Sequence, residues 1–305
     1  MRGERTVAGP AERADVTRAE RADAARAERA DAAGADAARI ARLSTRCRLV
    51  LLEMIHRAGS GHAGSSLSCT DIIGVLKFDQ MDRRADRSTG DVFVLSKGHA
   101  APAWYAALIV DGDLPAEEVG TLRALDSRLQ GHPDRTRLGL VDVSTGALGQ
   151  GLSVAVGRAL ARRLHGRDST VYCLLGDGEC QEGQVWEAFL YAGAHRVPGL
   201  VAIIDHNGGQ SDGAVADILP LYSLPEKLRA FGWHVDEVDG HDHGALRDVL
   251  RRRDRDRPSV IIAHTRKGRL GPDRVLLRGS HSDLPSAAEY AAAVDYLETL
   301  LEQDL

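Results

Sequence analysis

The sequence of 305 residues has few aromatic side chains and no long apolar run. Aromatic residues make up only 4% of the chain, which disfavours a platform for stacking nucleic-acid bases. No apolar stretch approaches the roughly 20 residues that a membrane-spanning helix needs. The formal net charge is −5, so the chain also lacks the basic excess typical of proteins that bind nucleic acid or anionic membranes. We therefore expect that the protein neither binds nucleic acid nor associates with a membrane.

Cysteine is scarce and shows no paired spacing. The four cysteines, Cys47, Cys69, Cys173 and Cys180, form no CxxC motif, as expected for free thiols in a reducing compartment. The N-terminus mixes acidic residues with arginines and lacks the apolar core of a secretory signal. These features predict a cytoplasmic protein. Hydrophobic residues, at 43%, are sufficient for a globular core.

Residues 1–39 form a zone with a composition of its own. A pattern of eight residues recurs as AERADVTR, AERADAAR and AERADAAG, and the zone contains no Leu, Ile or aromatic residue. Alanine favours helix, and alternating charges favour solubility, but such a segment cannot form a core. We predict a solvated extension, either a frayed helix or a disordered arm. One folded domain is expected to follow over residues 40–305.

From residue 40 onward the hydrophobic pattern is that of an α/β domain. Apolar residues at helical spacing from Ile40 to Met54 predict an amphipathic helix that ends at Gly59. Strands are expected at 92–95, 170–175, 200–204, 234–238 and 259–263, and helices at 70–78, 100–110, 148–164, 184–194, 224–231, 245–252 and 287–301. Alternation of strands and helices predicts a doubly wound fold, in which a mainly parallel sheet carries helices on both faces.

The segment with the clearest chemistry directly follows the strand expected at 170–175. It reads GDGE at 176–179, and the next strand leads to Asn207. Because the carboxyl ends of parallel strands meet at one edge of a sheet, Asp177 and Asn207 are expected to lie together where open α/β sheets bind ligands. A carboxylate and a carboxamide suit Mg²⁺ or Ca²⁺, and glycines let backbone amides approach a diphosphate. A plain tight turn is the alternative for GDG taken alone.

These residues resemble the signature of the transketolase family. GDGE followed by IIDHNGGQSDG is similar to its thiamin-diphosphate signature, and STGALGQGLSVAVG at 144–157 resembles its GPLGQG segment. Three further stretches resemble the histidine loops of the family and contain His62, His99 and His132. The motifs arrive in family order across roughly residues 45–295. The resemblance is to the N-terminal half of a transketolase and implies the thiamin-diphosphate-binding fold.

The resemblance implies a role for each matching residue. Asp177 and Asn207 would bind the metal through their side chains, and Gly209 through its carbonyl. The implied cofactor-binding residues are His99, Gly146, Ala147, Leu148, Gly176, Asp177, Gly178, Glu179, Asn207 and His281. The resemblance also implies catalytic residues, which would line the sugar channel, transfer protons or lie at the edge of the active site. They are His62, His99, His132, Glu182 and His281. Glu182 would face the subunit interface.

The chain departs from the family pattern at two positions. Ala147 stands where the family usually has proline, so the loop that contains it would be less rigid. Gly209 stands where the family usually has an aliphatic residue. Glycine keeps the backbone carbonyl that would bind the metal, but the packing around that carbonyl would differ.

The resemblance also implies cofactors and a partner. The cofactors would be thiamin diphosphate and Mg²⁺, with Ca²⁺ or Mn²⁺ able to replace the metal. In the family, a second domain supplies a glutamate to the pyrimidine ring, and no such domain follows in this sequence. The expectation is a split enzyme in which a separately encoded C-terminal subunit binds the pyrimidine, as an α2β2 assembly. It would transfer a two-carbon ketol unit from a ketose, which is expected to be phosphorylated, to an aldose.

Three alternatives remain open at this point. Another split thiamin-diphosphate enzyme, of the deoxyxylulose-phosphate synthase or 2-oxo acid lyase or dehydrogenase type, would share the GDG signature. A degenerate subunit would hold the cofactor without doing chemistry. A Mg²⁺-dependent phosphohydrolase would need a base beside the GDG loop, where Glu179 and Glu182 are the only candidates.

Three other features have plainer interpretations. The histidines at 241 and 243 are spaced like a metal pair, but the segment is predicted to cap a helix. Cys180 is predicted to be a packed thiol near the site. The mixed charges at 251–257 indicate a solvated helix end.

Overall fold

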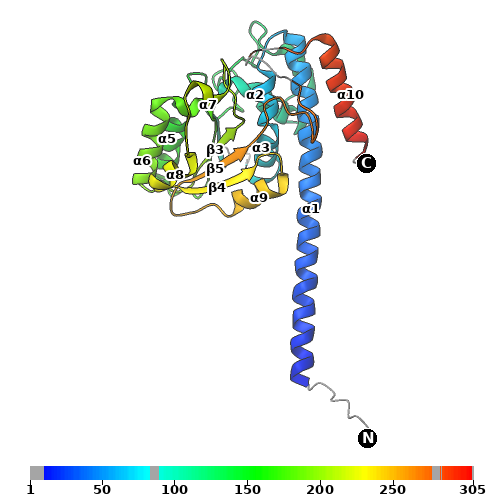
Figure 1. Cartoon of the computed structure of the whole chain (residues 1–305), viewed down its shortest axis with the longest axis vertical. Coiled ribbons are helices and arrows are strands. Elements are labelled where there is room, and N and C mark those ends of the chain that lie inside the picture. Colours follow the sequence, from blue (N-terminus) through cyan, green and yellow to red (C-terminus); the bar gives the residue numbers. More distant parts are fainter. Residues whose placement is uncertain (1–9, 83–88, 277–281, 283, 304–305) are drawn as a thin grey trace. The chain divides into compact units, whose positions relative to one another are not determined.

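The structure is a computed structural model that describes residues 10–82, 89–276, 282 and 284–303, with side chains from residue 34 onward. The chain divides into two compact units, residues 1–39 and residues 40–305. The sheet and all helices after the first belong to the second unit (Figure 1). No helix in the described ranges is long and apolar enough to cross a membrane.

The first helix begins earlier in the chain than the apolar pattern predicts. Helix α1 spans Pro10–Ala58 and therefore includes the alanine-rich repeats, which are helical here rather than a disordered arm. Alanine has the highest helix propensity, and no proline interrupts the segment, so the backbone stays helical without a core. Leu51 and Ile55 are fully buried. The helix ends at Gly59 as predicted, where a φ of +56° closes the last turn.

The predicted doubly wound, parallel sheet is confirmed. The described part of the chain contains five strands, β1 (Val92–Leu95), β2 (Val171–Gly176), β3 (Leu200–His206), β4 (His234–Asp239) and β5 (Ser259–His264). Their order is β1-β2-β3-β5-β4, and every neighbouring pair is parallel. Gly176 at the end of β2 pairs with Asp205 in β3. The residues that follow these two strands therefore meet at one edge of the sheet.

Helices cover both faces of the sheet (Figure 1). After α1, the described α-helices are α2 (Ala63–Ser68), α3 (Thr70–Val75), α4 (Ala101–Val110), α5 (Gln150–Leu164), α6 (Gly183–Ala194), α7 (Val215–Ile218), α8 (Leu224–Ala230), α9 (His243–Arg251) and α10 (Ala287–Gln303). The sequence pattern did not predict α2 and α7, which are too short to show a helical period. A π turn at Leu76–Gln80 continues the chain from α3.

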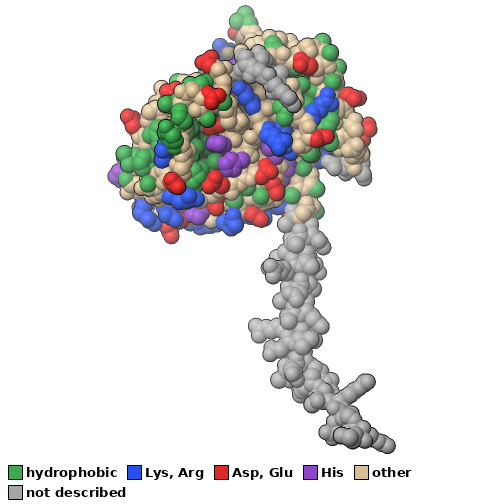
Figure 2. All heavy atoms as spheres, viewed as in Figure 1, with side chains coloured by type: hydrophobic (Ala, Val, Ile, Leu, Met, Phe, Trp, Pro, Cys, Tyr) green, Lys and Arg blue, Asp and Glu red, His purple; other side chains and the backbone are tan. Residues whose placement is uncertain are grey.

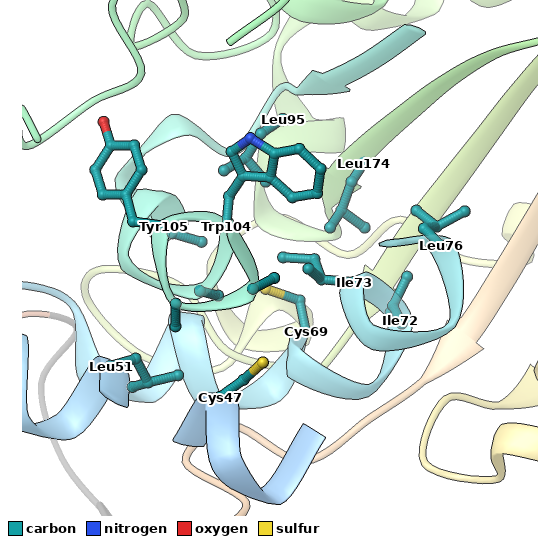
Figure 3. Close-up of a cluster of buried hydrophobic side chains, with 14 of the residues drawn as sticks. Cys47, Leu51, Cys69, Ile72, Ile73, Leu76, Leu95, Trp104, Tyr105 and Leu174 are labelled. Carbon is teal, nitrogen blue, oxygen red and sulfur yellow. The ribbon is translucent and has the colours of Figure 1, made fainter. Parts of the chain in front are cut away.

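Successive residues of a strand belong alternately to two hydrophobic clusters, as expected for a sheet covered on both sides. In β2, Tyr172 and Leu174 belong to the cluster that contains residues of α1, α3 and α4, whereas Cys173 and Leu175 belong to the cluster of α5, α6 and α8. Figure 3 shows part of the first cluster, with Leu174 among helix side chains. All four cysteines are buried and free, and burial raises the pKa of the Cys180 thiol, so its predicted packing is confirmed.

The segment at 241–243 caps a helix, as predicted. Asp242 Oδ1 accepts a hydrogen bond from Ala245 N at 2.9 Å at the start of α9. His241 and His243 contact Asp71, at 2.8 and 3.1 Å, rather than a metal site. Among the described residues, no three or more His, Cys, Asp or Glu side chains are grouped so that they could hold a metal ion.

Candidate functional site

A pocket of about 100 Å³ opens at the carboxyl ends of β2 and β3. Asp177, Asn207 and Gly209 all line it, so the structure brings together the three residues predicted to bind a metal. The other predicted cofactor residues that line this pocket are His99, Leu148, Gly176, Gly178 and Glu179. Four residues to which the sequence analysis gave no role also line it, namely Ser65, Lys97, Gln210 and Ser211.

Asp177 is a buried carboxylate, 1% exposed, that forms no ion pair with Lys or Arg in the described part of the chain. Its oxygens accept hydrogen bonds from two backbone amides, Gly178 N at 2.9 Å and Gly208 N at 2.6 Å. Burial and the negative charge of Asp205 raise the pKa of Asp177. Each carboxylate oxygen can accept more than one hydrogen bond or ligand contact. A divalent cation beside Asp177 would offset the cost of the buried charge, so this donor set fits a metal.

Asn207 is held in place by its own neighbours. Its Nδ2 donates to Asp205 Oδ2 at 3.1 Å, and its Oδ1 accepts from Gly209 N at 3.0 Å. The nitrogen of the amide group therefore donates to a residue of β3, and its oxygen faces the turn at 207–209. This orientation leaves an oxygen rather than a nitrogen for a hard cation.

The wall of the pocket contains a buried ion pair that the sequence pattern did not reveal. Lys97 Nζ, from the loop after β1, donates to Asp205 Oδ2 at the end of β3. Ser68 Oγ donates to the same carboxylate at 2.6 Å, and Thr265 Oγ1 donates to its other oxygen. The signal was available, because an aspartate that directly continues the apolar strand LVAII needs a buried partner.

Glu179 lines the pocket, but its carboxylate is occupied within the protein. It accepts hydrogen bonds from Gly149 N at 3.0 Å, from Gly176 N at 3.1 Å and from the Ser96 hydroxyl. Burial raises its pKa. The side chain therefore joins the ends of β1 and β2 to the loop before α5. Its described contacts make it a positioning residue for the pocket.

The loop before α5 is packed tightly against its surroundings. Gly146 has a φ of +150°, and a Cβ built on it would lie 3.2 Å from Cγ of His132, so the position requires glycine. The Leu148 carbonyl accepts from Gln184 Nε2 at 2.7 Å. Ala147, which stands in place of a proline in the family pattern, is exposed and is not among the residues that line the pocket.

The predicted catalytic residues lie in three places. The rings of His62 and His99 meet edge to face, with centroids 5.2 Å apart, and His99 lines the pocket. His132 lies beside Gly146, and burial and the charge of Arg123 lower its pKa. Glu182 precedes α6 and is exposed. The predicted residue His281 lies outside the described residues.

Comparisons with known proteins identify the family of the chain. Residues 40–294 match the family described as "Transketolase, thiamine diphosphate binding domain". The 6-deoxy-6-sulfo-D-fructose transketolase subunit SqwG of Clostridium sp. (strain MSTE9) is 40% identical over 256 residues, 82% of this chain and 93% of the relative. In Phocaeicola vulgatus, a protein named as a subunit of apulose-4-phosphate transketolase is 36% identical over 268 residues, 85% of this chain and 94% of the relative.

Full-length transketolases are also similar. The crystal structure of transketolase from Campylobacter jejuni superposes with a TM-score of 0.72 at 27% identity and covers 87% of this chain. The match covers only 47% of that enzyme, so the chain spans about half its length. Human transketolase is 41% identical over 232 residues, which is 37% of the human enzyme.

The fold and the pocket define a parallel α/β domain of the thiamin-diphosphate-binding type. The chain belongs to the transketolase family, a family of transferases, and carries its thiamine diphosphate binding domain. Thiamin diphosphate is therefore the cofactor for which the domain is built. The phosphohydrolase alternative loses its support, because it depended on a GDG turn outside this family.

Proposed function

We propose that the chain is the thiamin-diphosphate-binding subunit of a two-component transketolase. The observation that carries the proposal is the meeting of Asp177, Asn207 and Gly209 at the end of two neighbouring parallel strands. Two relatives that are named as transketolase subunits have nearly the length of this domain, which supports a split enzyme. The proposed reaction moves a two-carbon ketol unit from a ketose, with or without a phosphate group, to an aldose.

The chain's own residues would hold the cofactor in the following way. Asp177 and Asn207 would bind Mg²⁺ through side-chain oxygens and Gly209 through its carbonyl, with Ca²⁺ or Mn²⁺ as substitutes. Backbone amides around Gly178 and the imidazole of His99 would contact the diphosphate. When bound, thiamin diphosphate supplies the nucleophilic carbon and the electron sink for ketol transfer.

The histidines would contact the sugar substrate rather than bind the metal. His62 and His132 would line the donor channel with His99 between the cofactor and the substrate. Burial and the charge of Arg123 lower the pKa of His132, which favours the neutral imidazole that can accept a proton from a sugar hydroxyl. His281 would contribute to the same site, as its place in the family pattern implies.

The proposed partner subunit would cover the start and the outer face of α6. Glu182 is exposed at the beginning of this helix, and Leu190 and Tyr191 expose 54% and 46% of their surface farther along it. An exposed apolar helix face beside a family interface residue suits a protein partner. We propose a C-terminal, pyrimidine-binding chain in an α2β2 assembly, in the cytoplasm, where free thiols persist.

The proposal is tested by reconstitution. The chain is purified alone and together with a C-terminal transketolase subunit from the same genome, and ketol transfer from a ketose is measured with thiamin diphosphate and Mg²⁺. Activity should require both subunits, and thiamin diphosphate should bind only when a divalent metal is present. Turnover by the isolated chain would refute the split arrangement. Turnover of a 2-oxo acid instead of a ketose would assign the complex to the other class of split enzyme.

A matched pair of variants tests the role of Glu182. Glu182→Gln should lower kcat of the complex by about a hundredfold or more while leaving the unfolding temperature of the chain unchanged, because the side chain is exposed. Glu187→Gln removes an equally charged, exposed side chain of α6 and serves as the control. Equal effects of the two variants would contradict a specific role for Glu182.

A further inference from the structure

Two hollows lie at the edge of the sheet opposite the cofactor pocket. The first, of about 410 Å³, is lined by Arg135, Arg158, Arg162 and Arg167, and the second, of about 340 Å³, shares the last two and adds Arg163, Arg253 and Arg255. The segment that precedes β2 lines both hollows, and Pro198 and Gly199, which precede β3, line the second. We call the two hollows together the arginine groove.

The groove has its own place in the molecule. Strand β2 contains six residues and separates the groove from Asp177 by about 20 Å at the usual rise of an extended strand. Figure 2 shows Lys and Arg side chains gathered at the lower left, where Figure 1 places the chain between α9 and β5. Arg253 and Arg255 belong to that connection and line the second hollow, whereas Arg251 ends α9 and is exposed, as predicted for this charged run.

Arg162 is the central side chain of the groove. It is 8% exposed and lines both hollows, and its guanidinium donates to the hydroxyl of Ser169. No carboxylate lies within ion-pair distance of it in the described part of the chain. Burial and the charges of Arg158 and Arg167 lower its pKa, and they outweigh the opposing charges of Asp91 and Asp142. Its hydrogen-bond partner is neutral and no carboxylate pairs with it directly, so an anion in the hollows would stabilise this guanidinium.

The other buried arginines of the domain each form an ion pair with a carboxylate. Arg48 pairs with Asp71 at 2.6 Å, and Arg247 pairs with Asp79 at 3.0 Å. The three carboxylates that line the groove form no ion pair with its arginines, although the charge of Asp142 acts on Arg162. Asp142 accepts from Phe93 N at 2.9 Å, and Asp254 pairs with Arg257 at 2.7 Å. The third groove carboxylate, of Asp168, is exposed. The positive charge of the groove is therefore concentrated in a chain whose net charge is −5.

We propose that the arginine groove binds a small anionic ligand that carries phosphate groups, at a site separate from the cofactor pocket. Planar guanidinium groups with several donors match the oxygens of a phosphate, and several arginines around one cavity suit a polyphosphate. Seven arginines and three aspartates line the hollows, and the charged side chains come from two connections of the sheet, β1 to β2 and α9 to β5. Such convergence supplies a small ligand with donors on several sides.

The test uses the full chain and inorganic pyrophosphate in metal-free buffer, where the buried charge of Asp177 disfavours an anion in the cofactor pocket. The groove variant is Arg158→Gln/Arg167→Gln, whose side chains are at least partly exposed. The control, Arg46→Gln/Arg229→Gln, removes the same charge from exposed positions outside the groove. Calorimetric titration and the unfolding temperature with and without pyrophosphate are measured for each protein.

The unchanged chain and the control should bind pyrophosphate and gain in unfolding temperature. The groove variant should bind about tenfold more weakly or worse. Absence of binding by the unchanged chain, equal binding by all three proteins, or an equal loss in the control would overturn the proposal. If the groove variant fails to fold by circular dichroism, Arg163→Gln/Arg255→Gln replaces it with the same expectation. Parallel titrations with inorganic phosphate, a sugar phosphate and a nucleoside triphosphate distinguish the sources of the phosphate group.

Discussion

Lys97 and Asp205 form an ion pair that is almost entirely buried, with 2% and 0% of their side chains exposed. The pair joins the loop after β1 to the end of β3. Burial alone would raise the pKa of Asp205, but the Lys97 ammonium and the hydrogen bonds around the carboxylate outweigh it and lower that pKa. Since Asp205 in turn holds the amide of Asn207, the pair supports the wall of the cofactor pocket.

Removing one partner of this pair should be costly. We expect Lys97→Met or Asp205→Asn alone to reduce the free energy of unfolding by about 3–5 kcal/mol, because each leaves an uncompensated polar group buried. The double variant should lose less than the sum of the two single losses. Denaturant unfolding of the four proteins measures this, and additive losses would show that the two residues do not interact energetically.

Asp71 should make the stability of the domain depend on acid pH. Burial would raise its pKa, but Arg48, His241 and His243 outweigh burial and hold the pKa well below the ordinary 3.8. A carboxyl group whose folded-state pKa is depressed stabilises the fold above its unfolded pKa, and this contribution is lost as the pH falls through the folded value. Asp71→Asn should therefore be less stable than the unchanged chain at pH 6.

The difference in the free energy of unfolding between Asp71→Asn and the unchanged chain should narrow as the pH falls below about 4. At that pH the Asp71 carboxyl group becomes protonated and, like asparagine, carries no charge. Urea unfolding at a series of pH values measures the difference. Asp242→Asn, a change at an exposed cap of α9, is the control and should show no comparable narrowing. A constant difference between Asp71→Asn and the unchanged chain at all pH values would contradict the linkage.

Arg123 should tune the proton affinity of His132. Burial is the larger cause of the lowered pKa of His132, and the positive charge of Arg123 is the second. Arg123→Gln removes only the second cause, so the pKa should rise but stay below the ordinary 6.5. NMR titration of the imidazole measures it, with Arg137→Gln as a charge-matched comparison. A fall in the pKa, or the same rise in both variants, would show that the cause lies elsewhere.

Two glycines should respond in opposite directions to alanine. A Cβ at Gly178 would lie 2.8 Å from the Gln210 Cβ, whereas a Cβ at Gly157 in α5 meets nothing within 4 Å. We expect Gly178→Ala to destabilise the chain by about 1–3 kcal/mol and to weaken thiamin-diphosphate binding. Gly157→Ala should stabilise it by about 0.5–1 kcal/mol, since the helix gains in propensity.

The clash at Gly178 can be checked independently. Adding Gln210→Gly to Gly178→Ala removes the Cβ that the new methyl group meets, so cofactor affinity should recover in part. Titration with thiamin diphosphate and Mg²⁺ compares the single and double variants. If Gln210→Gly brings no recovery, the cost at Gly178 arises from the turn itself and not from this contact.

Hydrophobic pattern and motif spacing were enough to predict the strands, their parallel arrangement and the meeting of the candidate metal ligands. Buried runs such as LVAII are typical of interior strands, and parallel strands end at a common edge, so Asp177 and Asn207 had to approach each other. The motifs around them indicated the family before any contact was known. Short helices such as α7 were not predicted, because four residues are too few to show a helical period in hydrophobicity.

Which charges face one another became visible only in the folded chain. Lys97 and Asp205 are 108 positions apart, and nothing local marks them as partners. The same holds for Glu179, whose carboxylate joins the ends of β1 and β2 to the loop before α5, and for Arg162, on which the distant Asp91 acts. The sequence determines which side chains can carry a charge. The electrostatic field at each of them depends on burial and on residues distant in the sequence, and both are set only when the chain folds.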